Sequence, residues 1–200
     1  MQSFIHKVIY IFITDYIKVY ENAMPDDLCA SLIQRFDASP DVVEELEKPV
    51  NDDTLVVLKH LELDLTKLSD FATLQPVLMK ITELAVGKYQ SELPVRTFPR
   101  EIGAEIFRVK KYRGGDDSQD YFAYHVDVNS HSSARRYLAL CWYLNDVEKG
   151  GETFFPHPNV RIKPKQGRLA MYPSLWPWPH SEEHPQSGDK YVLRTYLHYL

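Results

Sequence analysis

The 200-residue sequence has only two cysteines, Cys29 and Cys141, and lacks a long hydrophobic run. Cys29 lies in a helical pattern and Cys141 in a strand pattern, so we expect two buried thiols in a reducing compartment, with a single disulfide as the open alternative. The apolar run Val8 to Ile13 is too short to span a bilayer and precedes no small-residue cleavage site, so we interpret it as a β-strand. These absences predict a soluble cytoplasmic protein that does not enter a membrane.

The chain also lacks an excess of positive charge, because it has 23 Lys and Arg against 28 Asp and Glu, which gives a net charge of −5. This balance argues against a nucleic-acid-binding surface, and we expect no nucleic-acid partner. No internal repeat, low-complexity tract or Gly/Ser linker interrupts the sequence. Its length and its 44% hydrophobic residues suit a single domain, residues 1–200, with a core of its own.

Helical signals concentrate in the first half of the chain. The segment 25–36 begins with a proline and two aspartates, and apolar residues follow at helical spacing. Residues 68–93 continue in that style, and Pro76 either begins a second helix there or kinks one long helix. The acidic stretch between these segments is weakly patterned, with one expected strand at 54–61.

After Pro99 the pattern changes to short strand-like runs separated by turn signals. Runs at this spacing suggest a sandwich or a double-sheet jelly roll. Because helices precede strands, we predict an α+β fold: a double-stranded β-helix (jelly-roll) core with N-terminal helices packed on one sheet. Residues 1–100 would be a helical support region and residues 101–200 the core. Strands are expected at 104–112, 121–128, 135–144, 152–156, 159–164, 168–173 and 190–200.

The stretch FAYHVDVNS, residues 122–130, places His125 and Asp127 two positions apart. In a strand, alternate side chains share one face, so the imidazole and the carboxylate would point the same way. Such a pair alone is more often a hydrogen-bonded pair than a metal site. A jelly roll sets a middle strand beside a late one, which would let His180 join them. Two histidines and one carboxylate form the facial triad of non-haem Fe(II) oxygenases.

Five motifs of the C-terminal half carry a family resemblance: KKYRGG (110–115), YFAYHVD (121–127), YLNDVEKGGETFFP (143–156), VRIKPKQGRLAMYPS (160–174) and HSEEHPQSGDKYVLRTYLHY (180–199). With them, the chain from about residue 105 resembles the 2-oxoglutarate/Fe(II)-dependent dioxygenases, specifically their prolyl 4-hydroxylase-like branch. That branch places a lysine ten residues after the distal histidine, the interval from His180 to Lys190. His184 is the competing distal ligand, but its distance from Lys190 does not match. Residues 19–36 resemble the family's opening strand and helix more weakly.

The resemblance implies that His125, Asp127 and His180 hold Fe(II), which 2-oxoglutarate and then O2 would bind, with ascorbate as a further family cofactor. Substrate hydroxylation would release succinate and CO2. The far carboxylate of 2-oxoglutarate needs a buried cation, for which Lys190 is the candidate, and Tyr112 matches the tyrosine that supports this carboxylate.

Two further residues of the last expected strand are predicted to contact the co-substrate. Arg194 and Tyr196 share strand parity with Lys190, so a regular strand would point all three into the barrel. Arg194 would back up or replace Lys190, or bind substrate, and an outward-facing cation at the barrel rim is the equally weighted alternative. Tyr196 stands where the family often has a tryptophan, and simple packing explains it equally well.

The resemblance, rather than any feature of a pocket, makes peptidyl proline the preferred substrate. The partner would be a peptide or protein, and Tyr121, Tyr124, Trp176 and Trp178 would form an aromatic groove for a proline-containing segment. Core packing explains such residues at least as often. Hydroxylation of another side chain, a free amino acid or a small molecule is the alternative within enzymes. A non-catalytic cupin-like metal-binding or interaction module is the alternative of another class.

Overall fold

The computed structural model describes residues 13–47, 58–93, 98–99, 101–116 and 118–200. The elements are η1 (Ile13–Tyr16), β1 (Lys18–Tyr20), α1 (Asp26–Ala38), β2 (Val43–Glu47), β3 (Leu58–Asp64), η2 (Leu65–Lys67), α2 (Phe71–Glu92), β4 (Ile102–Ala104), β5 (Arg108–Tyr112), β6 (Tyr121–His125), β7 (Arg136–Tyr143), β8 (Thr153–Phe155), β9 (Val160–Ile162), β10 (Leu169–Pro173), β11 (His180–Glu182) and β12 (Lys190–Tyr199). Residues 8–12 of the strand expected at Val8 to Ile13 lie outside the described residues, and Ile13 itself begins the 3-10 turn η1.

The two expected helices are present. Helix α1 starts directly after Pro25 and buries Cys29, Leu32 and Phe36 at intervals of three and four residues. Helix α2 runs without a break through Pro76, so the expectation that this proline begins a second helix is wrong. Within the described residues, neither helix is long and apolar enough to cross a membrane.

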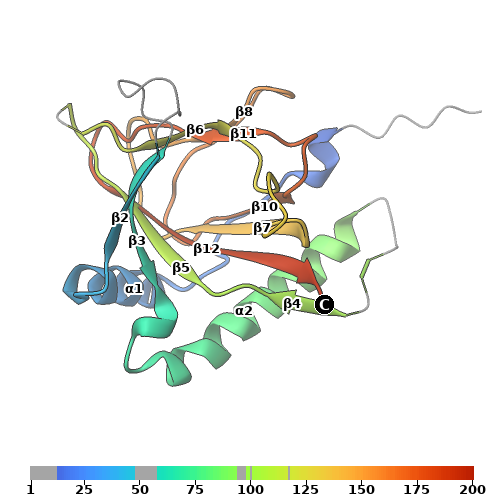
Figure 1. Ribbon diagram of the computed structural model, residues 1–200, viewed down its shortest axis with the longest axis horizontal. Coiled ribbons are helices and arrows are strands. Elements are labelled where there is room, and N and C mark those ends of the chain that lie inside the picture. The colour runs from blue at the N-terminus through green and yellow to red at the C-terminus, as the bar shows by residue number, and fades with distance from the viewer. Residues whose placement is uncertain (1–12, 48–57, 94–97, 100, 117) are drawn as a thin grey trace, which may run out of the picture.

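The strands form one continuous antiparallel sheet that folds into two layers around a shared interior. The hydrogen-bonded order is β1-β10-β7-β12-β5-β3-β6-β11-β8-β9, with β2 added beside β3 and β4 beside β12. We call β1-β10-β7-β12-β5-β3 the major sheet and β6-β11-β8-β9 the minor sheet. Figure 1 shows β6, β8 and β11 above the interior and both helices beneath the major sheet. The predicted α+β double-stranded β-helix is confirmed.

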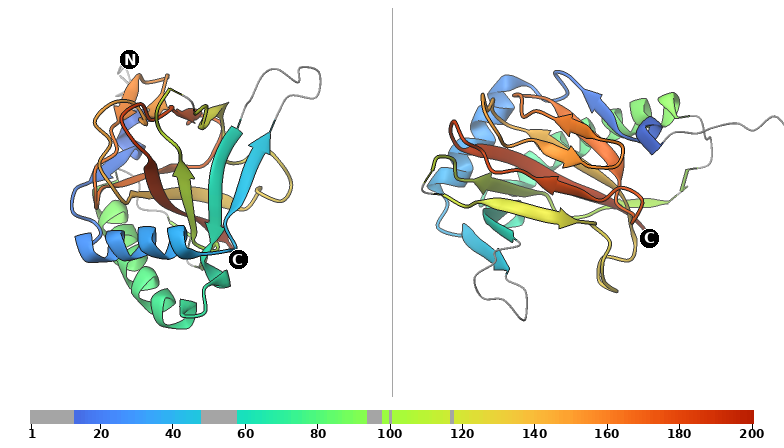
Figure 2. Two further views of the ribbon diagram at one scale, coloured as in Figure 1. Left: turned by 90° about the vertical axis from the view of Figure 1, so that its left-hand side faces the viewer. Right: turned by 90° about the horizontal axis from the view of Figure 1, so that it is seen from above.

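The N-terminal half adds strands as well as helices, which goes beyond a helical support region. Strand β3 pairs with β5 through residues 61–64 and with β6 through Leu58 and Lys59, so it joins the two sheets. Strand β2 (VEELE) is exposed along its length and pairs with β3 as an edge strand. Figure 2 shows this β2–β3 pair beside the barrel. Its charged residues lack the alternation that marks a half-buried strand, so the sequence carries little signal for it.

Strand β12 separates the hydrophobic core from the interior between the sheets. Leu193 and Leu197 face a large cluster that includes both helices, whereas Val192 and Tyr196 face a second cluster in the interior. This alternation puts Lys190, Val192, Arg194 and Tyr196 on one face, as the strand parity predicts. Cys29 and Cys141 are free and buried, in the first and second cluster respectively.

Candidate metal centre and its pocket

Three side chains meet at one end of the interior. The structure brings a ligand atom from each of His125, Asp127 and His180 within 4.8 Å of the others. The two histidines lie directly opposite each other, because β11 pairs with β6 in the register His180 to His125. Asp127 follows β6 by two residues, and its carboxylate lies 3.7 Å from His125 Nε2 and 3.9 Å from His180 Nε2.

Both histidines are oriented in the same way by the backbone. The Nδ1 atom of His125 lies 2.8 Å from the carbonyl oxygen of Ala123, and that of His180 lies 3.2 Å from the carbonyl oxygen of Trp178. An Nδ1–H that donates to a carbonyl leaves Nε2 with a free lone pair, which is how proteins orient metal-binding imidazoles. In the part of the chain that the structure describes, the buried His125 Nε2 has no hydrogen-bond partner. The donor set therefore fits a divalent metal ion.

The electrostatics keep His180 and Asp127 in their metal-binding forms. Burial, helped by His125 and Arg194 and opposed by Asp127, lowers the pKa of His180 to about 4, so its ring is neutral near pH 7. Burial alone would raise the pKa of Asp127, but Arg194 and the two histidines hold it well below its usual range. A neutral imidazole and an ionised carboxylate are the states that bind a metal.

Asp127 is held by further side chains. Arg194 Nη2 donates to both carboxylate oxygens, at 2.8 and 3.0 Å, and the Tyr196 hydroxyl donates to one of them at 2.8 Å. Arg136 donates to the Asp127 backbone carbonyl at 3.3 Å and lies over the Tyr196 ring. Arg194 and Tyr196 thus both contact a triad residue directly.

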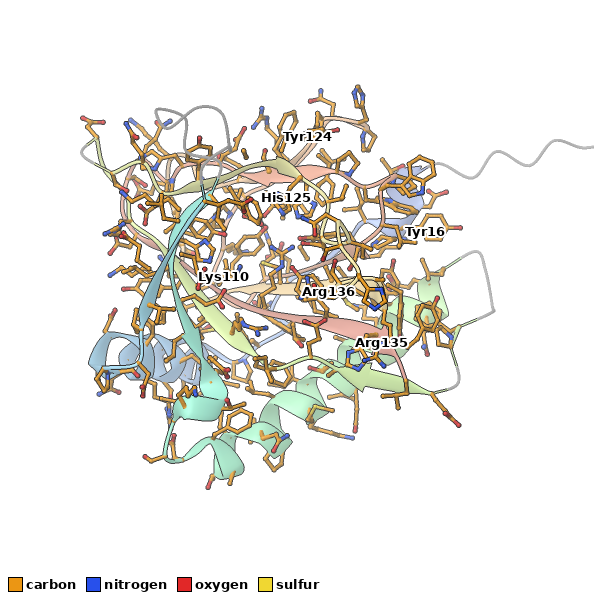
Figure 3. All side chains as sticks on the ribbon, viewed as in Figure 1. Tyr16, Lys110, Tyr124, His125, Arg135 and Arg136 are labelled. Carbon is orange, nitrogen blue, oxygen red and sulfur yellow. The ribbon has the colours of Figure 1, made fainter. Side chains whose placement is uncertain are left out.

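A pocket of about 330 Å³ opens beside the triad. Figure 3 shows His125 next to the minor sheet, with Lys110 and Arg136 reaching from the facing major sheet. Glu62, on the pocket wall, accepts from Arg108 at 3.0 Å and lies 3.2 Å from Lys110. The lining residues are Glu45, Leu58, His60, Glu62, Arg108, Lys110, Phe122, His125, Val126, Asp127, Asn129, Arg136, Arg194 and Tyr196.

Lys190, the predicted co-substrate anchor, is fully buried and already has an anionic partner. Its Nζ lies 2.9 Å from Glu182 Oε2 and 2.9 Å from the Gly151 carbonyl oxygen. Burial alone would raise the pKa of Glu182, but Lys190 and Arg194 lower it, so the carboxylate is ionised. The Lys190 ammonium lies 4.3 Å from the ring centre of Tyr112, and among the described residues the buried Tyr112 hydroxyl has no hydrogen-bond partner.

The four aromatic residues predicted to contact substrate do not line the triad pocket. Tyr124 and Trp176 are 55% and 79% exposed, and Tyr121 borders a different hollow beside His184. The Trp178 ring packs edge-on against Tyr16 and against the interior cluster. Their contact with substrate stays a prediction.

His184, the competing ligand, is outside the triad. Its ring nitrogens lie 3.0 Å from the carbonyl oxygens of Asp120 and Gly115. His184 therefore holds the loop that follows β5. Within that loop, the Arg113 guanidinium donates hydrogen bonds to the Asp120 carboxylate. The choice of His180 over His184 agrees with this geometry.

Sequence reasoning missed three neighbours of the triad. The Phe122 ring stacks on His125 with 3.4 Å between ring centres, and the Tyr172 hydroxyl lies 3.2 Å from His180 Nε2. Glu182, the third, stands two positions after His180 on the same strand. Because alternate side chains of a strand share one face, the spacing of two between His180 and Glu182 predicts that Glu182 also points into the interior.

Comparisons with known proteins agree with this geometry. The profile of the 2OG-Fe(II) oxygenase superfamily matches residues 107–198. A probable prolyl 4-hydroxylase 7 of Arabidopsis thaliana is 33% identical over 72 residues, which are 36% of this chain and 23% of that protein. This chain therefore matches about a quarter of that relative's length.

Two solved structures share the fold. A viral collagen prolyl hydroxylase from Paramecium bursaria Chlorella virus-1, in a 2OG complex, superposes with a TM-score of 0.64 at 19% identity, covering 92% of this chain and 96% of the other. A Trichoplax adhaerens prolyl hydroxylase, in complex with a hypoxia inducible factor oxygen degradation domain peptide fragment, superposes with a TM-score of 0.64 at 16% identity, covering 92% and 84%. Through the profile match over 107–198 and the triad of His125, Asp127 and His180, this chain is similar to the 2OG-Fe(II) oxygenase superfamily.

Proposed function

We propose that this protein is an Fe(II)- and 2-oxoglutarate-dependent hydroxylase whose substrate is a prolyl residue in a peptide. The observation that carries the proposal is the convergence of His125 Nε2, His180 Nε2 and the Asp127 carboxylate at the edge of an open pocket. Three protein ligands leave positions on a metal for other groups, as a facial triad requires. With Fe(II) and 2-oxoglutarate bound, O2 would be the oxidant: one oxygen atom would enter succinate as 2-oxoglutarate loses CO2, and the other would convert a substrate C–H to C–OH.

The chain's own residues position and shield this chemistry. The two backbone-fixed imidazoles and Asp127 would hold the metal, and Tyr196 and Arg194 keep the carboxylate in place. Phe122 stacks on His125, and the ring centre of Phe155 lies 5.2 Å from that of His180, so apolar faces limit water at the ligands. A dry, preorganised ligand shell strengthens electrostatic interactions with a bound cation.

The peptide substrate rests on similarity. The curated relative is described as a probable prolyl 4-hydroxylase, and one structural neighbour holds a peptide fragment. The pocket opening and the exposed rings of Tyr124 and Trp176 offer apolar surface to an extended chain. A cytoplasmic location and a role for ascorbate remain predictions.

The test begins with the metal and co-substrate. We expect anaerobic addition of Fe(II) and 2-oxoglutarate to the apo-protein to produce the weak visible charge-transfer band of the chelate. Succinate release would then be measured across a panel of proline-containing peptides and matched peptides with alanine in place of proline. Release that depends on the proline supports the full proposal.

The other outcomes identify the alternatives. A band with no proline-dependent release would retain the oxygenase and reject the peptidyl-proline substrate, and free amino acids and small molecules would be screened next. Metal binding without a band for any 2-oxo acid would overturn the oxygenase proposal in favour of a non-catalytic metal-binding module.

A further inference from the structure

Four charged side chains of alternating sign lie in a row inside the barrel. Arg194 Nη2 lies 2.8 Å from Asp127, Arg194 Nη1 lies 3.9 Å from Glu182, and Glu182 lies 2.9 Å from Lys190. None is more than 6% exposed. The row runs from the triad to the lysine expected to bind the far carboxylate of 2-oxoglutarate, so Glu182 stands between the metal site and that lysine.

Glu182 is firmly placed next to Lys190. The oxygen that accepts from Lys190 also accepts from the Thr153 hydroxyl at 2.9 Å, and that hydroxyl lies 2.6 Å from the Tyr143 hydroxyl. All of these residues are buried. Moving the carboxylate out would break these bonds and leave a buried charge without its partner, which is strongly unfavourable.

The other cations around the interior also contact carboxylates, and two of them share one. Within the described residues, Arg194 has Asp127, and Lys110 and Arg108 share Glu62. Arg136 has Glu105, at 2.7 Å. A second carboxylate that enters beside Lys190 would meet the charge of Glu182 at short range, where like charges repel.

We propose that Glu182 is a specificity-determining residue that neutralises Lys190 and so withholds the usual counter-charge from the far carboxylate of the co-substrate. This inference rests on the proposed function, because it concerns the co-substrate of the same site. It follows that the metal-loaded protein discriminates weakly between 2-oxoglutarate and 2-oxopentanoate, in which a methyl group replaces the far carboxylate. A carboxylate at the position of Glu182 thus broadens the acceptable class to 2-oxo acids with an uncharged tail.

The test measures dissociation constants of both 2-oxo acids for the anaerobic Fe(II) protein by the charge-transfer band. For the wild type we expect the two constants to agree within about fivefold, less than the change produced by one hydrogen bond to a charged group. Glu182→Gln frees the lysine and should increase the preference for 2-oxoglutarate by about tenfold or more.

A double variant provides the control. Lys190→Met with Glu182→Met replaces the buried ion pair by apolar side chains of similar length, a change that proteins often tolerate. It should leave the wild-type ratio of the two constants unchanged.

Results that would overturn this inference differ from those that would overturn the proposed function. A wild-type preference for 2-oxoglutarate of about 100-fold that disappears in the double variant would show that Lys190 binds the far carboxylate, and would overturn this inference while supporting the oxygenase. The wild-type ratio needs no variant, so misfolding of a variant leaves the test intact. No band with either acid would overturn the proposed function itself.

Discussion

Arg194 Nη2 donates hydrogen bonds to both oxygens of Asp127, at 2.8 and 3.0 Å, so the triad carboxylate is also the counter-charge of a buried guanidinium. Both groups are almost fully buried. A divalent cation bound by Asp127 would therefore lie close to a second positive charge, and the two would compete for one carboxylate.

Arg194→Met should consequently tighten metal binding. The change removes a nearby positive charge and leaves the Asp127 oxygens for the metal, and we expect the dissociation constant for Co(II) to fall roughly tenfold, about 1.4 kcal/mol. Competition with a chromophoric chelator measures it. Arg113→Met, in the loop held by Asp120, is the matched control. Weaker Co(II) binding by Arg194→Met would mean that Arg194 mainly orients the carboxylate.

His180→Ala and His184→Ala should have different effects, because His180 is a metal ligand whereas His184 contacts the backbone of a loop. Because only His180 shares the triad, its loss should weaken Co(II) binding by more than the roughly 10–100-fold that loss of an outer-shell partner costs. His184→Ala should retain near-wild-type affinity, and hydrogen exchange should increase in the 113–120 loop that His184 contacts. Equal loss of affinity in both variants would contradict this assignment.

Glu62→Gln should reduce stability in a pH-dependent way. Burial would raise the pKa of Glu62, but His60, Lys110 and Arg108 lower it from 4.5 to about 2. A depressed folded-state pKa contributes stability that is fully present above about pH 4.5 and is lost as the pH falls towards 2. We expect the variant to lose about 3 kcal/mol at pH 7, and the difference from wild type to shrink between pH 4.5 and 2.

Urea unfolding across this pH range measures the effect. Glu47→Gln on the exposed strand β2 is the control. A stability difference for Glu62→Gln that does not change with pH would show that the loss comes from packing rather than from the carboxylate charge.

Leu193→Ala should destabilise the fold while sparing the metal site. Leu193 is fully buried, and its side chain faces the helix-covered cluster on the opposite side of β12 from Arg194. We expect a loss of about 3 kcal/mol in the free energy of unfolding, with Co(II) affinity unchanged in the folded protein. Leu46→Ala, at a position that is 50% exposed, should change stability by less than about 0.5 kcal/mol. An equal cost for both variants would contradict the assigned core.

The sequence supports the local half of the site well. The sequence spacing of two brings Asp127 close to His125, although β6 ends at His125 and Asp127 lies just beyond the strand. Strand parity places Lys190, Arg194 and Tyr196 on one face of β12, and this depends only on the geometry of an extended chain. Strand β2 was not predicted, because an exposed charged strand owes its structure to its pairing with β3 rather than to its own pattern.

Identifying His180 as the third ligand required more than the local sequence pattern. His180 and His184 are equally plausible from their own neighbours, and only the family interval to Lys190 favoured His180. In the structure the choice follows from antiparallel register, since β11 sets His180 opposite His125. Register between strands 55 residues apart in the sequence is a non-local property.

By itself, the sequence determined that both helices lie in the first half and a run of strands in the second, the inward parity of the last strand and the residue types of the triad, because these follow from backbone periodicity and ligand chemistry. Only the tertiary structure decided which charges neutralise one another. Glu182 and Lys190 are eight residues apart on different strands, and they become partners because the barrel buries both where water cannot solvate either alone.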